Sequence, residues 1–71
     1  MGEPMKIPQI VLTLRERAHM TQSQLDEAAG LPVSTISRVE RGKMQLKANY
    51  LLRIIDATGH EFVIRRKEET K

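Results

Sequence analysis

Apolar residues recur every three or four positions along most of the chain, a pattern that predicts a series of short helices. Four such segments cover about residues 8–19, 22–29, 33–41 and 47–58, with polar or glycine-containing stretches between them. Isolated helices of this length are marginal in water, so we expect the four to share one core. With 71 residues, the sequence predicts a single small all-α domain.

The start of the second segment carries a strong local signal. Thr21 is followed three residues later by Gln24, and Met20 and Leu25 lie on either side of this pair. This arrangement is typical of a capping box with a hydrophobic staple, which predicts a helix start at about residue 22. Gly30 then predicts the end of that helix, because a chain that turns sharply out of a helix usually needs a positive φ.

Helical spacing resumes directly after a short turn at residues 30–32. Val33, Ile36 and Val39 recur at helical spacing up to an expected stop at Gly42, and Ile36 and Val39 are expected to face inward. Two short helices joined by a glycine-containing turn predict a helix-turn-helix unit. In the fourth segment, the pattern predicts burial of Leu51, Leu52, Ile54, Ile55 and Ala57.

The C-terminal stretch 60–66 has a different period. Phe62 and Ile64 alternate with Val63 and Arg65, and the β-branched and aromatic content predicts a strand. A lone strand leaves its backbone groups unpaired, so we expect it to pair antiparallel with the same strand of a second copy. Two alternatives remain: an intramolecular pair with residues 5–7, or no strand.

The sequence resembles the Xre, Cro-CI and lambda-repressor-like family of DNA-binding domains over residues 8–64. The residues that carry the resemblance are Gln22, Leu25, Ala29, Gly30, Leu31, Ile36, Val39 and the Glu40-Arg41-Gly42 ending. The resemblance implies four short helices in a lambda-repressor-like helix-turn-helix fold, followed by one strand that pairs across a dimer. Asp26 departs from the pattern, because the family usually has alanine there. We hypothesise that its carboxylate accepts hydrogen bonds from the start of the next helix, where the dipole favours an anion.

The outward positions of the helix at 33–41 are the candidate base contacts, and they match the family's base-contacting positions. They are Val33, Ser34, Ser37 and Arg38. An arginine can donate to guanine O6 and N7 together, and a valine can contact a thymine methyl. The serines can bond base edges or phosphates. The alternative for all four is a solvated helix surface.

Five further residues are candidate phosphate contacts: Gln22, Thr35, Arg41, Lys43 and Lys47. The family uses a glutamine at the Gln22 position for this purpose, whereas the lysines are equally compatible with plain solvated charges. The family also pairs an arginine of its first helix with the glutamate of the Glu-x-Gly ending. The resemblance therefore implies a structural salt bridge between Arg15 and Glu40.

Charge and composition favour a protein that binds phosphates and argue against several other classes of protein. The formal net charge is +3, and residues 38–53 carry five basic side chains against one acid, which indicates a phosphate-binding face. The absence of cysteine, of a glycine-rich phosphate loop and of a plausibly spaced Ser-His-Asp set argues against an enzyme, a thiolate metal site or a cofactor. With no long apolar run and no signal-peptide pattern, a cytoplasmic protein without membrane contact is expected.

These observations predict a disordered lead-in at 1–6, a DNA-binding domain at 7–66 with its dimerising strand at 60–66, and a charged tail at 67–71. The expected function is sequence-specific binding of double-stranded DNA by a homodimer that represses its own promoter at an inverted-repeat operator. The stretch after the fourth helix also resembles antitoxins that partner HipA-type kinases, which implies a cognate toxin. The alternatives are a phage-type repressor, or a module that binds a toxin or other protein without reading DNA.

Overall fold

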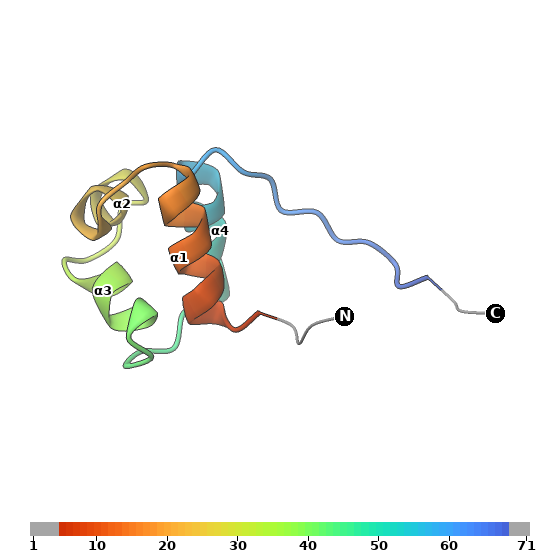
Figure 1. Ribbon diagram of the computed structural model, residues 1–71, viewed down its shortest axis with the longest axis horizontal. Coiled ribbons are helices and arrows are strands. Elements are labelled where there is room, and N and C mark those ends of the chain that lie inside the picture. Colours follow the sequence, from red (N-terminus) through yellow and green to blue (C-terminus); the bar gives the residue numbers. More distant parts are fainter. Residues whose placement is uncertain (1–4, 69–71) are drawn as a thin grey trace.

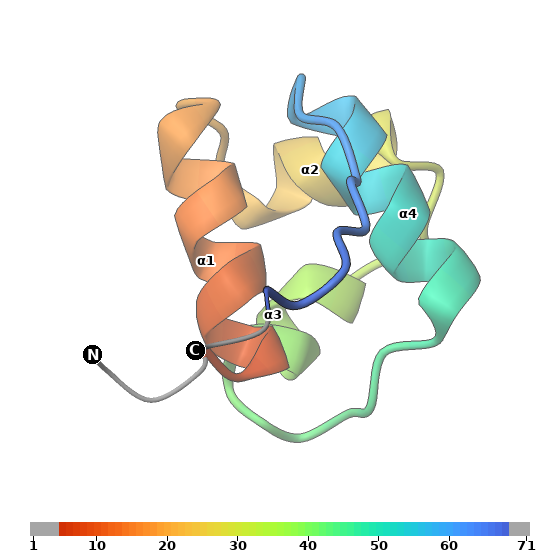
Figure 2. The same ribbon diagram turned by 90° about the vertical axis from the view of Figure 1, so that its right-hand side faces the viewer.

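The computed structural model describes residues 5–68, and within this range it contains four helices and no strand. They are α1 (Ile7–Arg17), α2 (Gln22–Ala28), α3 (Thr35–Glu40) and α4 (Ala48–Ala57). Helices α1 and α4 form one layer, and α2 and α3 form the other (Figures 1 and 2). The all-α fold predicted from the sequence is therefore confirmed for the helical part of the chain.

One small core joins the two layers. Its fully buried side chains come from all four helices: Val11 from α1, Leu25 from α2, Ile36 and Val39 from α3, and Ile54 from α4. Burial of a side chain of this size contributes about 1.5–3 kcal/mol relative to its exposure to water. Because α3 supplies two of the five, the inward face predicted for this helix is confirmed, and the position of α3 is set by the core.

Two details of the predicted helices are wrong. Helix α3 begins at Thr35, two residues later than expected, so Val33 and Ser34 lie in the preceding turn. Leu52 of α4 is 49% exposed, although the apolar pattern predicted its burial. Its neighbours Ile54 and Ile55 fill the inward positions of α4, which leaves Leu52 on the outer side of a ten-residue helix.

The predicted strand at 60–66 is extended chain in this structure. It runs out from the end of α4, away from the layer of α2 and α3 (Figure 1). The alternative pairing with residues 5–7 is wrong, because Lys6 and Ile7 begin helix α1. Phe62, Val63 and Ile64 are exposed here, and Ile64 reaches 82%. Strand formation needs a partner for these backbone groups, so pairing between two copies stays a prediction.

The two ends of the chain lie partly outside the described residues. The predicted disordered lead-in covers 1–6, of which 1–4 are not described. Lys6 belongs to the fold, since it is the N-cap of α1 and its backbone N–H donates to Gln9 Oε1 at 3.0 Å. Of the predicted charged tail 67–71, only residues 67 and 68 are described, and both are exposed.

Candidate nucleic-acid interface

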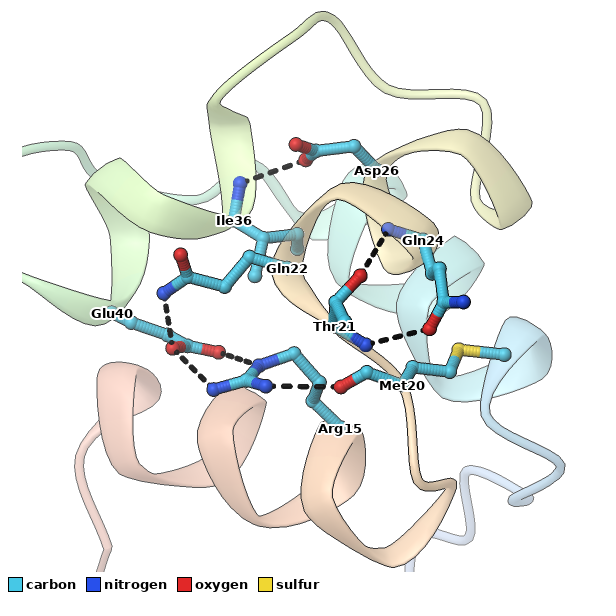
Figure 3. Close-up of polar contacts among 8 residues, drawn as sticks. All are labelled: Arg15, Met20, Thr21, Gln22, Gln24, Asp26, Ile36 and Glu40. Atoms are coloured by element: carbon cyan, nitrogen blue, oxygen red, sulfur yellow. Dashed lines mark hydrogen bonds and ion pairs between the residues drawn. The ribbon is translucent and has the colours of Figure 1, made fainter.

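The start of α2 is fixed by the predicted capping box. Thr21 Oγ1 accepts a hydrogen bond from the Gln24 backbone N–H at 3.0 Å, and Gln24 Oε1 accepts one from the Thr21 N–H at 2.8 Å (Figure 3). Two N–H groups that a helix start leaves unpaired are thereby satisfied. The cap sets where α2 begins, and hence where the Gln22 side chain emerges.

The turn between α2 and α3 is closed by local hydrogen bonds. Gly30 adopts φ 68°, and the Leu31 N–H then donates to the Asp26 carbonyl at 2.8 Å. Thr35 donates its hydroxyl to the Pro32 carbonyl at 2.7 Å and is only 3% exposed. Thr35, predicted as a phosphate contact, therefore lies inside the fold and closes the turn, and we leave it out of the proposed DNA contacts.

The first turn of α3 is capped from another helix. Ser34, its N-cap, adopts φ 70° and makes no side-chain capping bond. Asp26 of α2 takes that role, because Oδ2 accepts from the Ser34 N–H at 3.1 Å and Oδ1 from the Ile36 N–H at 2.9 Å. The hypothesis that this buried carboxylate satisfies the start of α3 is confirmed. Its anionic charge also suits the positive end of the helix dipole.

The last turn of α3 is tied to α1 by a bidentate ion pair. Arg15 Nε lies 2.7 Å from Glu40 Oε2, and Arg15 Nη2 lies 3.0 Å from Glu40 Oε1. The two side chains are 17% and 8% exposed, so the pair that the resemblance implied is present and mostly buried. The hydrogen bond to Glu40 raises the pKa of Arg15, against the lowering effect of burial, so the guanidinium keeps its charge throughout the physiological range.

Arg15 also reaches the connection between α1 and α2. Its Nη1 donates to the Met20 carbonyl at 3.0 Å, one residue before the Thr21 cap (Figure 3). A single guanidinium thus joins α1, the end of α3 and the chain that leads into α2. The Gln22 side chain joins this cluster through Glu40, because its Nε2 donates to Glu40 Oε1 at 2.9 Å.

The link between Gln22 and Glu40 had not been predicted from the sequence. The two residues are 18 positions apart, on helices whose relative placement is decided by the core. The resemblance assigned each residue a separate role, Gln22 toward phosphate and Glu40 toward Arg15. In the structure, the Arg15 and Gln22 side chains both donate to the Glu40 carboxylate.

The remaining predicted contacts lie on the outer side of α3 and just after it. Val33 is 88% exposed, Ser34 and Arg38 are exposed, and Ser37 is half-buried. Three cationic side chains follow in the sequence, Arg41 and Lys43 after α3 and Lys47 just before α4, and all three are exposed. Among residues 5–68 the only ion pair is Arg15–Glu40, so none of these cations is neutralised within the part of the chain described. We call the exposed residues of this stretch, together with half-buried Ser37, the α3 face.

Other kinds of site find no support in the described part of the chain. Residues 5–68 contain no group of three or more His, Cys, Asp or Glu side chains that is able to hold a metal ion. No helix in the same range is long and apolar enough to span a bilayer. The α3 face therefore remains as the candidate site in this part of the chain.

Comparison with known protein families decides the assignment. A family model described as helix-turn-helix (HTH_3) matches residues 11–61, from the middle of α1 to just beyond α4. The chain belongs to the helix-turn-helix family. The family is of the Xre and Cro-CI type, so this helix-turn-helix protein is a DNA-binding transcription regulator. No curated protein and no solved structure gave a match.

Proposed function

We propose that this helix-turn-helix protein places α3 in the major groove of double-stranded DNA and reads base edges with Val33, Ser34, Ser37 and Arg38. The observation that carries the proposal is the contrast between the two sides of α3. Its inner side is fixed by the core, by Asp26 and by the Glu40 ion pair, whereas its outer side is uncovered and basic. A major groove admits one α-helix, and its donor and acceptor pattern identifies each base pair.

Phosphate contacts complete this interface in the proposal. Arg41, Lys43 and Lys47 follow the reading helix without an ion-pair partner among residues 5–68, as cations that neutralise phosphates would. Gln22 is a further proposed phosphate contact, and its side chain extends from the start of α2 toward Glu40 at the end of α3 (Figure 3). Such contacts fix the register of the protein on the duplex and make the affinity fall steeply with salt.

The proposed binding unit is a homodimer. Phe62, Val63 and Ile64 are exposed in the single chain, and antiparallel pairing of two such segments satisfies their backbone groups and covers apolar side chains. Arg65 extends the same strand. A two-fold dimer sets its two reading helices in successive major grooves, ~34 Å apart, and so reads an inverted repeat.

Repression follows from occupancy of the promoter, and we propose that the promoter is the protein's own. We extend the proposal to an antitoxin role, supported by the resemblance of the C-terminal stretch to antitoxins of HipA-type kinases. A cognate toxin would be the second partner.

Selection of bound duplexes from a random DNA pool at physiological salt tests the proposal. Enrichment of an inverted repeat with half-sites about one helical turn apart is the expected result. The Arg38→Ala variant, selected in parallel, should lose the preference at one position of each half-site. Enrichment of nothing above background would contradict DNA reading and assign the function to a protein partner.

A further inference from the structure

We propose that Glu40 is a positioning residue for DNA binding: it holds the Gln22 carboxamide in the orientation that contacts the DNA backbone. This inference rests on the proposed function. It assigns to Glu40 a role beyond the ion pair with Arg15, because the carboxylate couples the phosphate contact of α2 to the reading helix α3. The argument starts from the hydrogen bonds around the carboxylate.

Three N–H donors converge on Glu40. Oε2 accepts from Arg15 Nε at 2.7 Å, and Oε1 accepts from Arg15 Nη2 at 3.0 Å and from Gln22 Nε2 at 2.9 Å (Figure 3). The two bonds from the planar guanidinium fix the plane of the carboxylate, since bidentate pairing is geometrically specific. Glu40 is thus an acceptor with a fixed position, and the bond from Gln22 to it fixes the Gln22 side chain as well.

The order matters because a glutamine side chain has many rotamers. A side chain of this length loses rotamer freedom when it is fixed, and that loss opposes binding. In this structure Gln22 loses that freedom in the free protein, before any DNA is present. A carboxamide nitrogen carries two N–H groups. One is directed to Glu40, and the second remains to donate to a phosphate oxygen.

A carboxylate close to a phosphate contact would ordinarily oppose binding by charge repulsion. Arg15 offsets this repulsion, because its guanidinium lies within 3.0 Å of both carboxylate oxygens and balances their charge. The cluster of Arg15, Glu40 and Gln22 therefore presents an ordered amide without presenting net negative charge. Glu40 also lies two residues after Arg38 on α3, so the phosphate and base contacts share one rigid frame.

A double-mutant cycle tests this role. Affinity for the selected operator is measured for the wild type, Gln22→Ala, Glu40→Gln and the double variant, at a temperature where urea titration shows each to be folded. A lost neutral hydrogen bond to phosphate lowers affinity by about three- to tenfold. Positioning predicts that Glu40→Gln loses a similar factor, and that this loss disappears when Gln22 is already alanine.

Two measurements separate positioning from electrostatics: the direction in which Glu40→Gln changes the affinity for DNA, and the salt dependence of that affinity. Removal of a negative charge beside DNA should raise affinity if Glu40 acts only through its charge, whereas positioning predicts a loss. Because Gln22 is neutral, Gln22→Ala should leave the slope of log affinity against log salt unchanged. The matched control is Lys43→Ala, which should flatten that slope by about one unit and combine additively with Glu40→Gln.

The outcomes are distinct. Equal losses from Glu40→Gln in the wild-type and Gln22→Ala backgrounds, or a gain in affinity, would overturn the positioning role while leaving DNA reading intact. Failure of the wild type to bind any duplex would overturn the proposed function, and this inference with it. If Glu40→Gln proves unfolded, Glu40→Asp enters the same cycle, because it keeps the charge and withdraws the carboxylate by one methylene from Gln22.

Discussion

The Asp26 carboxylate and the backbone N–H of Ile36 are hydrogen-bonded at 2.9 Å, so a side chain of α2 caps the first turn of α3. The second carboxylate oxygen accepts from the Ser34 N–H at 3.1 Å. Ser34 is the N-cap of α3, yet its own side chain makes no capping bond. The beginning of α3 therefore depends on a residue that precedes the turn.

The Asp26→Ala variant should lower the free energy of unfolding by about 1–2 kcal/mol, because it leaves two N–H groups at the start of α3 without an acceptor. Urea denaturation measures the change. Asp26→Asn is the matched control, since it keeps one oxygen acceptor and should lose less. A stability of Asp26→Ala equal to or above that of the wild type would show that the carboxylate is merely tolerated.

Ser34→Gly should stabilise the protein by about 0.5–1 kcal/mol. Ser34 has φ 70°, a conformation that costs a residue with a Cβ about 1 kcal/mol and costs glycine nothing. For a domain of this size, the gain corresponds to a rise in Tm of a few degrees, measured by thermal unfolding. Ser34→Ala separates the backbone effect from loss of the hydroxyl, and a Tm as high as that of Ser34→Gly would contradict the explanation.

Local features of the sequence predicted much of this site. The capping box of Thr21 and Gln24 and the inward face of α3 depend on residues only three apart, so spacing alone reveals them. The start of α3 was placed too early because Val33 continues the apolar spacing. The left-handed Ser34 interrupts the helix there, and no glycine marks the position.

Features that depend on distant partners were beyond the sequence pattern. The bond from Gln22 to Glu40 spans 18 residues and exists only because the core places α2 beside the end of α3. Leu52 continues the apolar pattern of α4, yet only one side of that helix can face the core, and Leu52 lies on the other side. The segment 60–66 has strand-forming residues, but a strand is completed by a partner, which a single chain does not supply.

Substitution of Arg38 and of Lys43 should separate the contribution of base recognition from that of phosphate contacts. Arg38→Ala is expected to reduce discrimination at one base position by about 1–3 kcal/mol, because a bidentate contact to guanine is lost. Lys43→Ala should weaken binding to all sequences alike. Titrations of the operator and of single-base variants, each at several salt concentrations, measure both effects. Equal losses on every sequence from Arg38→Ala would identify Arg38 as a phosphate contact.

The ion pair should be important for folding as well as for DNA binding. Arg15→Ala is expected to cost about 3 kcal/mol in the free energy of unfolding, because Glu40 would be left mostly buried without its partner. Arg17→Ala, an exposed arginine of the same helix, serves as control and should change stability by less than about 0.5 kcal/mol. Similar urea midpoints for the two variants would show that the pair contributes little.

Ile64→Lys should convert the proposed dimer to a monomer without unfolding the helices. The side chain is 82% exposed in the single chain, so its replacement disturbs no packing there, while a lysine opposes burial between two strands. Sedimentation velocity measures the mass, and circular dichroism measures the helical content. Leu52→Lys replaces another exposed apolar residue outside the segment and should remain dimeric. A dimeric Ile64→Lys variant would place the contact elsewhere.

Helix α3 is six residues long, and side chains from other helices hold both of its ends. Asp26 fixes the first turn, and Arg15 fixes the last through Glu40. Residues that maintain the shape of the helix are therefore separate from those that face outward. Substitutions at the exposed positions Val33, just before the helix, and Arg38, within it, are then nearly free of folding constraints. Under the proposed binding mode, a lineage could acquire a new target sequence through such changes while its scaffold stayed the same.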